Sequence, residues 1–187
     1  MELEDLLRRC RQGDELAWEA LVRRYQGRVY GLALHYLRNR EEALDAAQEI
    51  FVRVYSKLDT LREGQAFLPW LVRLGRNCCL DRLRRLKVRT PEIEVAMEDA
   101  APTLAAGDPN PEESGRAKQR RDLLHRAIAT LSDNSREMIF LKDIHELKLD
   151  EIAELLAVPV GTVKSRSSRA RVELAKAVRA LTPEAGV

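Results

Sequence analysis

Cysteine is scarce in this sequence of 187 residues, and no long apolar run is present. Of the three cysteines, Cys78 and Cys79 are adjacent and Cys10 stands apart, so no disulfide framework or spaced metal motif is readable. Residues 1–15 are crowded with charge, which argues against an apolar signal segment there. The sequence also has no run of about eighteen apolar residues, which is the length that a membrane span would need. We therefore expect a reduced, cytoplasmic protein that needs no metal and no cofactor.

Aromatic residues and glycines are also few, at 5 % and nine residues, whereas Leu, Ala, Arg and Glu dominate. This composition is typical of helical proteins. Apolar residues recur at helical spacing in several stretches of the chain. We expect an all-α fold, with helices that begin after Asp14 and near Glu41, Pro69, Arg116, Ser135, Leu149 and Pro159. Asn134 and Glu137 have the spacing of a capping box.

Residues 90–115 differ in composition from the rest of the chain. They hold four of the seven prolines and seven acidic residues, with no Lys or Arg. Such a segment predicts a flexible acidic linker rich in proline. The linker divides the chain into two small helical domains, residues 1–89 and residues 116–187.

Two short helices near the C-terminus have the spacing of a helix-turn-helix. They read DEIAELL at 150–156 and PVGTVKSRSSRARVELAKAV at 159–178. Val163 and Ala170 can pack on the first helix, and the opposite face suits a major groove. The alternative is a solvated cationic helix. The candidate DNA contacts are Gly161, Thr162, Lys164, Ser165, Arg166, Ser168 and Arg169.

A second basic run lies between Arg73 and Arg89, with seven basic residues and one acidic residue. Read alone, such a run can equally be a solvated face. The two basic patches carry about +6 and +5 and the linker about −7, although the net charge of the chain is only +2. A near-neutral chain therefore hides strong charge segregation, which indicates a polyanionic partner.

Several blocks in both halves occur in the order of one protein family. The first half holds ALVRRYQGRVYGLALHYL, DAAQEIFVRVY and FLPWLVRLGRNCCLDRLRR; the second holds LSDNSREMIFLKDI, DEIAELL and VPVGTVKSR. In these blocks the chain resembles the extracytoplasmic-function (ECF) sigma factors of the sigma-70 family. The resemblance implies a region 2 helical bundle, a region 4 helix-turn-helix, and promoter-specific transcription initiation with core RNA polymerase.

The resemblance also implies roles for particular residues. The helix at 45–55 resembles the one that docks on polymerase, and its implied contacts are Phe51 and one face at helical spacing that we expect to be exposed, Asp45, Gln48, Glu49 and Arg53. Phe51 also has a reading as a core residue, because it lies on the apolar stripe. The next helix and the loop at 59–65 resemble the part that reads and opens the minus-10 element, with Trp70, Arg73, Arg76 and Asn77 as implied contacts. Trp70 is either a wedge at the duplex fork or a core tryptophan.

The resemblance further implies that the helix-turn-helix binds the minus-35 element. It also leads us to expect that the acidic linker threads a basic channel of polymerase. Anti-sigma partners are common in the family, but no residue pattern here requires one. Five positions depart from the family pattern: Ser167 and Ser168 are smaller than usual, Glu146 and Ala157 replace glycines, and Lys148 replaces a Ser or Thr cap. Recognition of the minus-35 element is therefore expected to differ from that of the family.

Two other classes of function compete with this interpretation. An enzyme is disfavoured because His35, His125 and His145 are scattered and no catalytic motif surrounds them. A stand-alone helix-turn-helix regulator would bind duplex DNA without polymerase, usually as a dimer on a palindrome. The blocks DAAQEIF and PWLVRLGRN argue against that second alternative.

Overall fold

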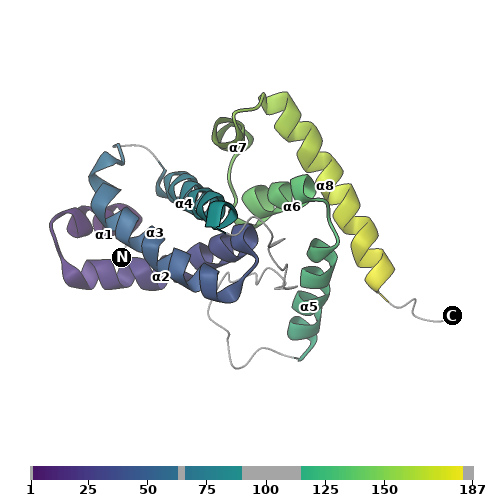
Figure 1. The fold of residues 1–187 in the computed structure, drawn as a ribbon, viewed down its shortest axis with the longest axis horizontal. Coiled ribbons are helices and arrows are strands. Elements are labelled where there is room, and N and C mark those ends of the chain that lie inside the picture. Colours follow the sequence, from purple (N-terminus) through teal and green to yellow (C-terminus); the bar gives the residue numbers. More distant parts are fainter. Residues whose placement is uncertain (1, 63–65, 90–114, 183–187) are drawn as a thin grey trace. The chain divides into compact units, whose positions relative to one another are not determined.

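The computed structural model describes residues 2–62, 66–89 and 115–182, and every regular element within them is helical (Figure 1). This confirms the predicted all-α fold. The chain divides into two compact units, Met1–Ala100 and Ala101–Val187. The predicted linker lies outside the described residues except Gly115, which begins a helix. The domain bounds 1–89, 90–115 and 116–187 therefore stay a prediction.

Within its described residues, the first unit has four α-helices and one short 3-10 turn. They are α1 (Leu3–Arg11), α2 (Glu15–Leu37), α3 (Arg40–Lys57), η1 (Leu58–Thr60) and α4 (Phe67–Arg89). Helices α2, α3 and α4 contact one another pairwise, and α1 packs on α2. Helix α1 was not predicted, although Leu3, Leu6, Leu7 and Cys10 have helical spacing. Leu6, Leu7 and Cys10 are buried in the core.

The helix starts of this unit follow from short polar side chains. The Asp14 carboxylate accepts a hydrogen bond from the backbone N–H of Ala17, and Asn39 accepts one from Glu42. Arg9 also donates to Asp14 at 2.7 Å. The hydrogen bond from Arg9, together with that from Ala17, holds the pKa of Asp14 below its ordinary value. The predicted cap at Asp14 is confirmed, and Asp14 also ties the end of α1 to the start of α2.

Gly75 allows α4 to cross α2 at close range. A Cβ atom at this position would clash with Cδ2 of Leu32 and would lie 3.4 Å from Cδ1 of Ile50. Both neighbours are buried, so they have little room to move aside. The glycine thus sets the spacing of the three-helix core on which the outward faces of α3 and α4 depend.

The second unit is built around its last helix. It consists of α5 (Gly115–Ala129), α6 (Asp133–Ile139), a π-helical turn η2 (Phe140–Ile144), α7 (Leu149–Leu156) and α8 (Val160–Leu181). Helices α5, α6 and α7 each pack on α8. Buried Ile128, Leu141, Ile152, Val163 and Ala170 line the junction. The predicted helix at 149–156 is confirmed to the residue.

The predicted capping box of Asn134 and Glu137 is wrong. Helix α6 begins at Asp133 with Ser132 as its N-cap, so Asn134 already lies inside the first turn. The Ser132 hydroxyl does not cap the helix but lies 3.2 Å from a carboxylate oxygen of Glu173 on α8. Arg136 organises this corner instead, since its guanidinium donates to the carbonyls of Ile128, Ala129 and Leu131 at 2.7–3.2 Å. Ile128 and Ala129 end α5 and Leu131 follows it, so Arg136 ties the end of α5 to the start of α6.

The turn between α7 and α8 contains a strained residue. Ala157 has φ 53°, in the left-handed region, and Glu146 before α7 has φ 56°. These are the two positions at which the family pattern has glycine, which explains that preference, because a Cβ is unfavourable there. At the start of α7, Glu151 accepts a hydrogen bond from the backbone N–H of Lys148 at 2.8 Å. Lys148 itself cannot accept one, so only half of a capping box is present.

We predict that Ala157→Gly raises the free energy of unfolding of the second unit by about 1 kcal/mol, because it relieves left-handed strain. Both tryptophans lie in the first unit, so amide hydrogen exchange of α7 and α8 is the suitable measurement. Ala153→Gly is the matched control, since Ala153 is buried within α7 and glycine there costs about 1 kcal/mol. Lower protection in Ala157→Gly than in the unmodified chain would contradict the assignment of strain.

Candidate nucleic-acid interface and docking face

The outward face of α8 carries the polar residues predicted to contact DNA. Val163 and Ala170 are buried against the rest of the unit, as expected. This orientation leaves Gly161, Lys164, Ser165, Ser168 and Arg169 exposed, and Thr162 and Arg166 half-buried. A surface of two exposed cations and two hydroxyl groups at the start of a helix can bind phosphates and base edges in a major groove.

Ser167 departs from the family pattern, and the structure shows the consequence. Its side chain is buried, in a place that a larger apolar residue would fill. A groove beside it runs between the end of η2 and α8, and it is lined by Lys142, Leu149, Lys164, Ser167, Ser168, Arg171, Val172 and Ala175. At its rim the Arg171 guanidinium donates a hydrogen bond to the Asp143 carboxylate at 2.5 Å, and this hydrogen bond raises the pKa of Arg171. Part of the positive charge of α8 is thus used inside the unit.

The predicted minus-10 residues lie on one stretch of α4. Asn77 is exposed, whereas Arg73 and Arg76 are half-buried. The Arg76 guanidinium lies 5.9 Å from the ring centroid of Tyr36, a cation–π contact that directs this side chain toward the end of α2. Trp70 is half-buried beside Phe67, with ring centroids 5.8 Å apart. Packing and partial exposure are both present, so the two readings of Trp70 stay open.

The loop predicted at 59–65 is more ordered at its start than expected. Residues 58–60 form the 3-10 turn η1, and Leu61 is buried. Arg11 of α1 donates to the Leu61 carbonyl at 2.9 Å, so the missed helix α1 helps to anchor this segment. Residues 63–65 lie outside the described residues. The role of the loop in opening the minus-10 element stays a prediction.

The residues of α3 predicted to bind polymerase do not form the single exposed face that was expected of them. Asp45 and Gln48 are exposed, as expected. Glu49 and Arg53 are half-buried and pair with each other at 2.5 Å. Phe51 packs against the core, in line with its reading as a core residue. The expected exposure of Glu49 and Arg53 is wrong. Arginines of α4 pack beside Glu49, and the sequence alone does not show which helix lies next to α3.

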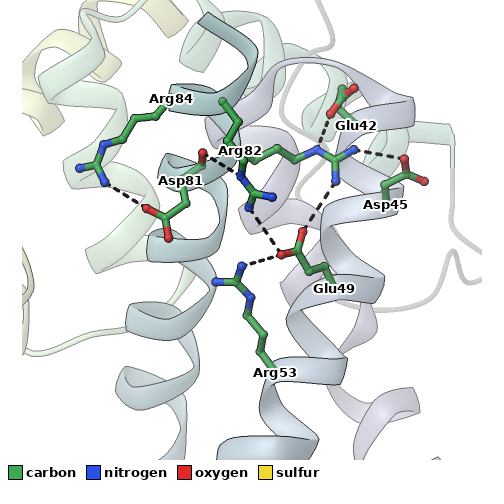
Figure 2. Close-up of polar contacts among 8 residues, drawn as sticks. Glu42, Asp45, Glu49, Arg53, Asp81, Arg82 and Arg84 are labelled. Atoms are coloured by element: carbon green, nitrogen blue, oxygen red, sulfur yellow. Dashed lines mark hydrogen bonds and ion pairs between the residues drawn. The ribbon is translucent and has the colours of Figure 1, made fainter. Parts of the chain in front are cut away.

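Figure 2 shows the ion cluster that joins α3 to α4, which consists of Glu42, Asp45, Glu49, Arg53, Arg82 and Arg85. Arg82 of α4 lies at its centre and hydrogen-bonds the Glu42 carboxylate. Its guanidinium also lies 3.2 Å from Asp45 and 3.8 Å from Glu49. Burial opposes the charge on Arg82, but the hydrogen bond to Glu42 and the nearby carboxylates outweigh it and raise the pKa of Arg82. Three carboxylates and three guanidinium groups make the ion cluster neutral.

A row of exposed apolar side chains on α3 was missed by the sequence analysis. Leu44, Val52 and Tyr55 are 56 %, 68 % and 65 % exposed and follow one another at helical spacing, with Gln48 between the first two. The ring of Tyr55 also packs beside that of Trp18, with the ring centroids 4.8 Å apart. We call Leu44, Gln48, Val52 and Tyr55 the apolar row. The signal was present in the sequence, since α3 has more apolar residues than one buried stripe can use.

The cysteines do not form a reactive site. Cys10, Cys78 and Cys79 are all buried, and burial raises the pKa of Cys79 to about 12. Such thiols stay protonated and are poor nucleophiles and metal ligands. Among the residues that the structure describes, no group of His, Cys, Asp and Glu side chains is arranged to hold a metal ion. No helix in the described part of the chain has the length and apolar character that a membrane crossing requires.

The fold and these surfaces define a two-unit helical protein with a helix-turn-helix suited to DNA. The chain matches the family model for sigma-70 region 2 over residues 21–89 and that for sigma-70 region 4 over residues 121–174. It is 34 % identical to the ECF RNA polymerase sigma factor SigW of Bacillus subtilis, covering 97 % of this chain and 99 % of the relative. It is 32 % identical to the RNA polymerase sigma-H factor of Pseudomonas aeruginosa, covering 97 % and 96 %.

Two solved structures have the same fold. One is the sigma factor RpoE of Bartonella quintana, solved with the anti-sigma factor NepR, with a TM-score of 0.66, 20 % identity, and 86 % and 96 % of the two chains covered. The other is CnrH, solved with the cytosolic domain of CnrY, with a TM-score of 0.60, 23 % identity and 94 % and 96 % of the two chains covered.

The chain belongs to the ECF sigma factors of the sigma-70 family. This family comprises transcription initiation factors rather than enzymes.

Proposed function

We propose that this sigma factor directs promoter-specific initiation by binding core RNA polymerase through α3, the minus-10 element through α4 and the minus-35 element through α8. The observation that carries the proposal is that α8 buries Val163 and Ala170 while Lys164 and Arg169 stay exposed on the opposite face. Since the polymerase works in the cytoplasm, this is where the protein would act. We also propose an anti-sigma partner, because one protein of the same fold, RpoE, was solved with the anti-sigma factor NepR.

The functional test is run-off transcription with purified core polymerase on a library of genomic fragments. Discrete promoter-specific transcripts should appear only when the protein is added. The rival reading, a stand-alone helix-turn-helix regulator, predicts duplex binding and no transcripts of this kind. Binding of palindromic duplex by a dimer, with no effect on core polymerase, would overturn the proposal.

The contacts proposed for the minus-35 element make a specific prediction. Lys164→Ala or Arg169→Ala should weaken binding to that element by about 1–3 kcal/mol, because each removes one cation from the recognition face. The measurement is holoenzyme affinity for promoter duplex at several salt concentrations, since phosphate contacts change the salt slope. Affinities equal to those of the unmodified protein in low and moderate salt would contradict the assignment.

Lys176→Ala is the matched control for these variants. Lys176 is an exposed cation on the same helix, closer to its C-terminus than the proposed recognition face. The substitution Lys176→Ala removes the same charge as Lys164→Ala and leaves the proposed recognition face intact. A loss in Lys176→Ala as large as in Lys164→Ala would mean that only the overall charge of α8 matters, and that Lys164 has no particular contact.

For polymerase docking we propose the apolar row together with Asp45. Exposed apolar side chains in a row are typical of a protein interface, because water leaves them on binding. The half-buried pairing of Glu49 makes it a counter-ion inside the unit rather than the main polymerase contact. The resemblance to the family and the exposure of Leu44, Gln48 and Val52 support the same helix.

Val52→Glu should therefore lower the affinity for core polymerase about tenfold or more, as expected for a charge placed at the centre of an interface. Helical content should not change, because Val52 is 68 % exposed. Gln26→Glu, an exposed position on α2 that gains the same charge, is the control. The measurement is equilibrium binding of labelled protein to core enzyme. Retained affinity in Val52→Glu would remove the apolar row from the docking face.

A further inference from the structure

Arg82 stands out among the arginines of α4, because it faces another helix rather than solvent. Its side chain is 21 % exposed, whereas that of Arg84, two residues later, is 76 % exposed and pairs only locally with Asp81 at 3.0 Å. The resemblance to the family implies no role for Arg82. In the sequence, Arg82 is one of the seven basic residues between Arg73 and Arg89. Its position among Glu42, Asp45 and Glu49 shows that its charge is directed toward carboxylates of α3 (Figure 2).

The three carboxylates around Arg82 differ in exposure. Glu42 and Glu49 have side chains 32 % and 30 % exposed, and Glu49 is held in addition by Arg53 and by Arg85 at 3.7 Å. Asp45 is 68 % exposed and has Arg82 at 3.2 Å. Asp45 therefore presents an oxygen to solvent while Arg82 fixes its orientation from behind.

Asp45 is also adjacent to the apolar row, since it follows Leu44 on the same helix and precedes Gln48 by three residues. An aspartate next to an apolar surface can set the register of a partner only if its carboxylate has a defined direction. The planar guanidinium of an arginine supplies this direction through its several fixed N–H groups, which a lysine cannot match.

We propose that Arg82 is a positioning residue for polymerase docking: it orients the Asp45 carboxylate at the edge of the apolar row and so prepares α3 to receive the polymerase. This inference rests on the proposed function. Because Arg82 lies on α4, five residues after Asn77, the docking helix and the minus-10 helix share one rigid connection. Arg82 does not itself need to contact polymerase.

The test is a double-mutant cycle on the full chain, with affinity for core polymerase as the readout. Arg82→Met should weaken binding about tenfold in the unmodified background, and by less than about twofold in the Asp45→Asn background, since its target is then already altered. Arg82→Lys should restore only part of the loss. Arg23→Met, which removes an exposed arginine paired with Glu19 at 2.6 Å on α2, should bind as the unmodified protein does.

Each other outcome is decisive. An equal loss from Arg82→Met in both backgrounds would show that Arg82 acts only through stability, and would overturn the inference, as would unchanged binding or full restoration by lysine. Helical content and melting temperature of every variant identify any that fail to fold, and Arg82→Lys then decides the question through its binding in the two backgrounds. Failure of the unmodified protein to bind core polymerase would instead overturn the proposed function.

Discussion

Each unit of this protein has a small core, against which the helices α3 and α8 each bury only one stripe of their surface. Small domains bury a limited share of their surface, and the helices must share that core. Once Ile50 and Val54 are fixed inside the first unit, the remaining faces of α3 point toward α4 or toward solvent. Once Val163 and Ala170 are fixed inside the second, the basic face of α8 must point outward. The orientation of the functional side chains is therefore a consequence of burial.

Charge acts at a second level, within the limits that burial sets. The arginines of α4 are expected from the sequence to form one cationic surface for nucleic acid. In the structure they divide, because Arg82 and Arg85 neutralise carboxylates of α3 while Arg76 lies over Tyr36. Half-buried ion pairs are valuable here less for stability, which is reduced by desolvation, than for the fixed geometry that they impose. The ion cluster thus converts two charged helices into one rigid piece.

The sequence predicts the positions of helices, which depend on the periodicity of apolar residues. It does not predict side-chain partners that belong to another element of the fold. Helical spacing and the Asp14 cap gave α2, α7 and α8 closely, since these signals are local. The α4 partners of Glu49, Arg82 and Arg85, are distant from it in the sequence, and the hydrogen bonds of Arg136 cross a turn, so no local pattern predicted these contacts. The capping box at Asn134 failed for a related reason, because Ser132 begins α6 without using its hydroxyl. Helix α1 was predictable from the helical spacing of Leu3, Leu6, Leu7 and Cys10, a local signal of the same kind.

The two proposed surfaces differ in the physics by which they would select partners. The recognition face of α8 is cationic and exposed, so its attraction to phosphates is long-ranged and weakens as salt displaces counterions. The apolar row on α3 has almost no charge of its own, and the carboxylates beside it are already neutralised by Arg53, Arg82 and Arg85. Its affinity would come from removing apolar area from water, which salt does not screen. A factor built in this way would hold polymerase through a contact less sensitive to ionic strength than the one through which it searches DNA. Salt that releases promoter DNA would therefore leave more of the contact with polymerase in place.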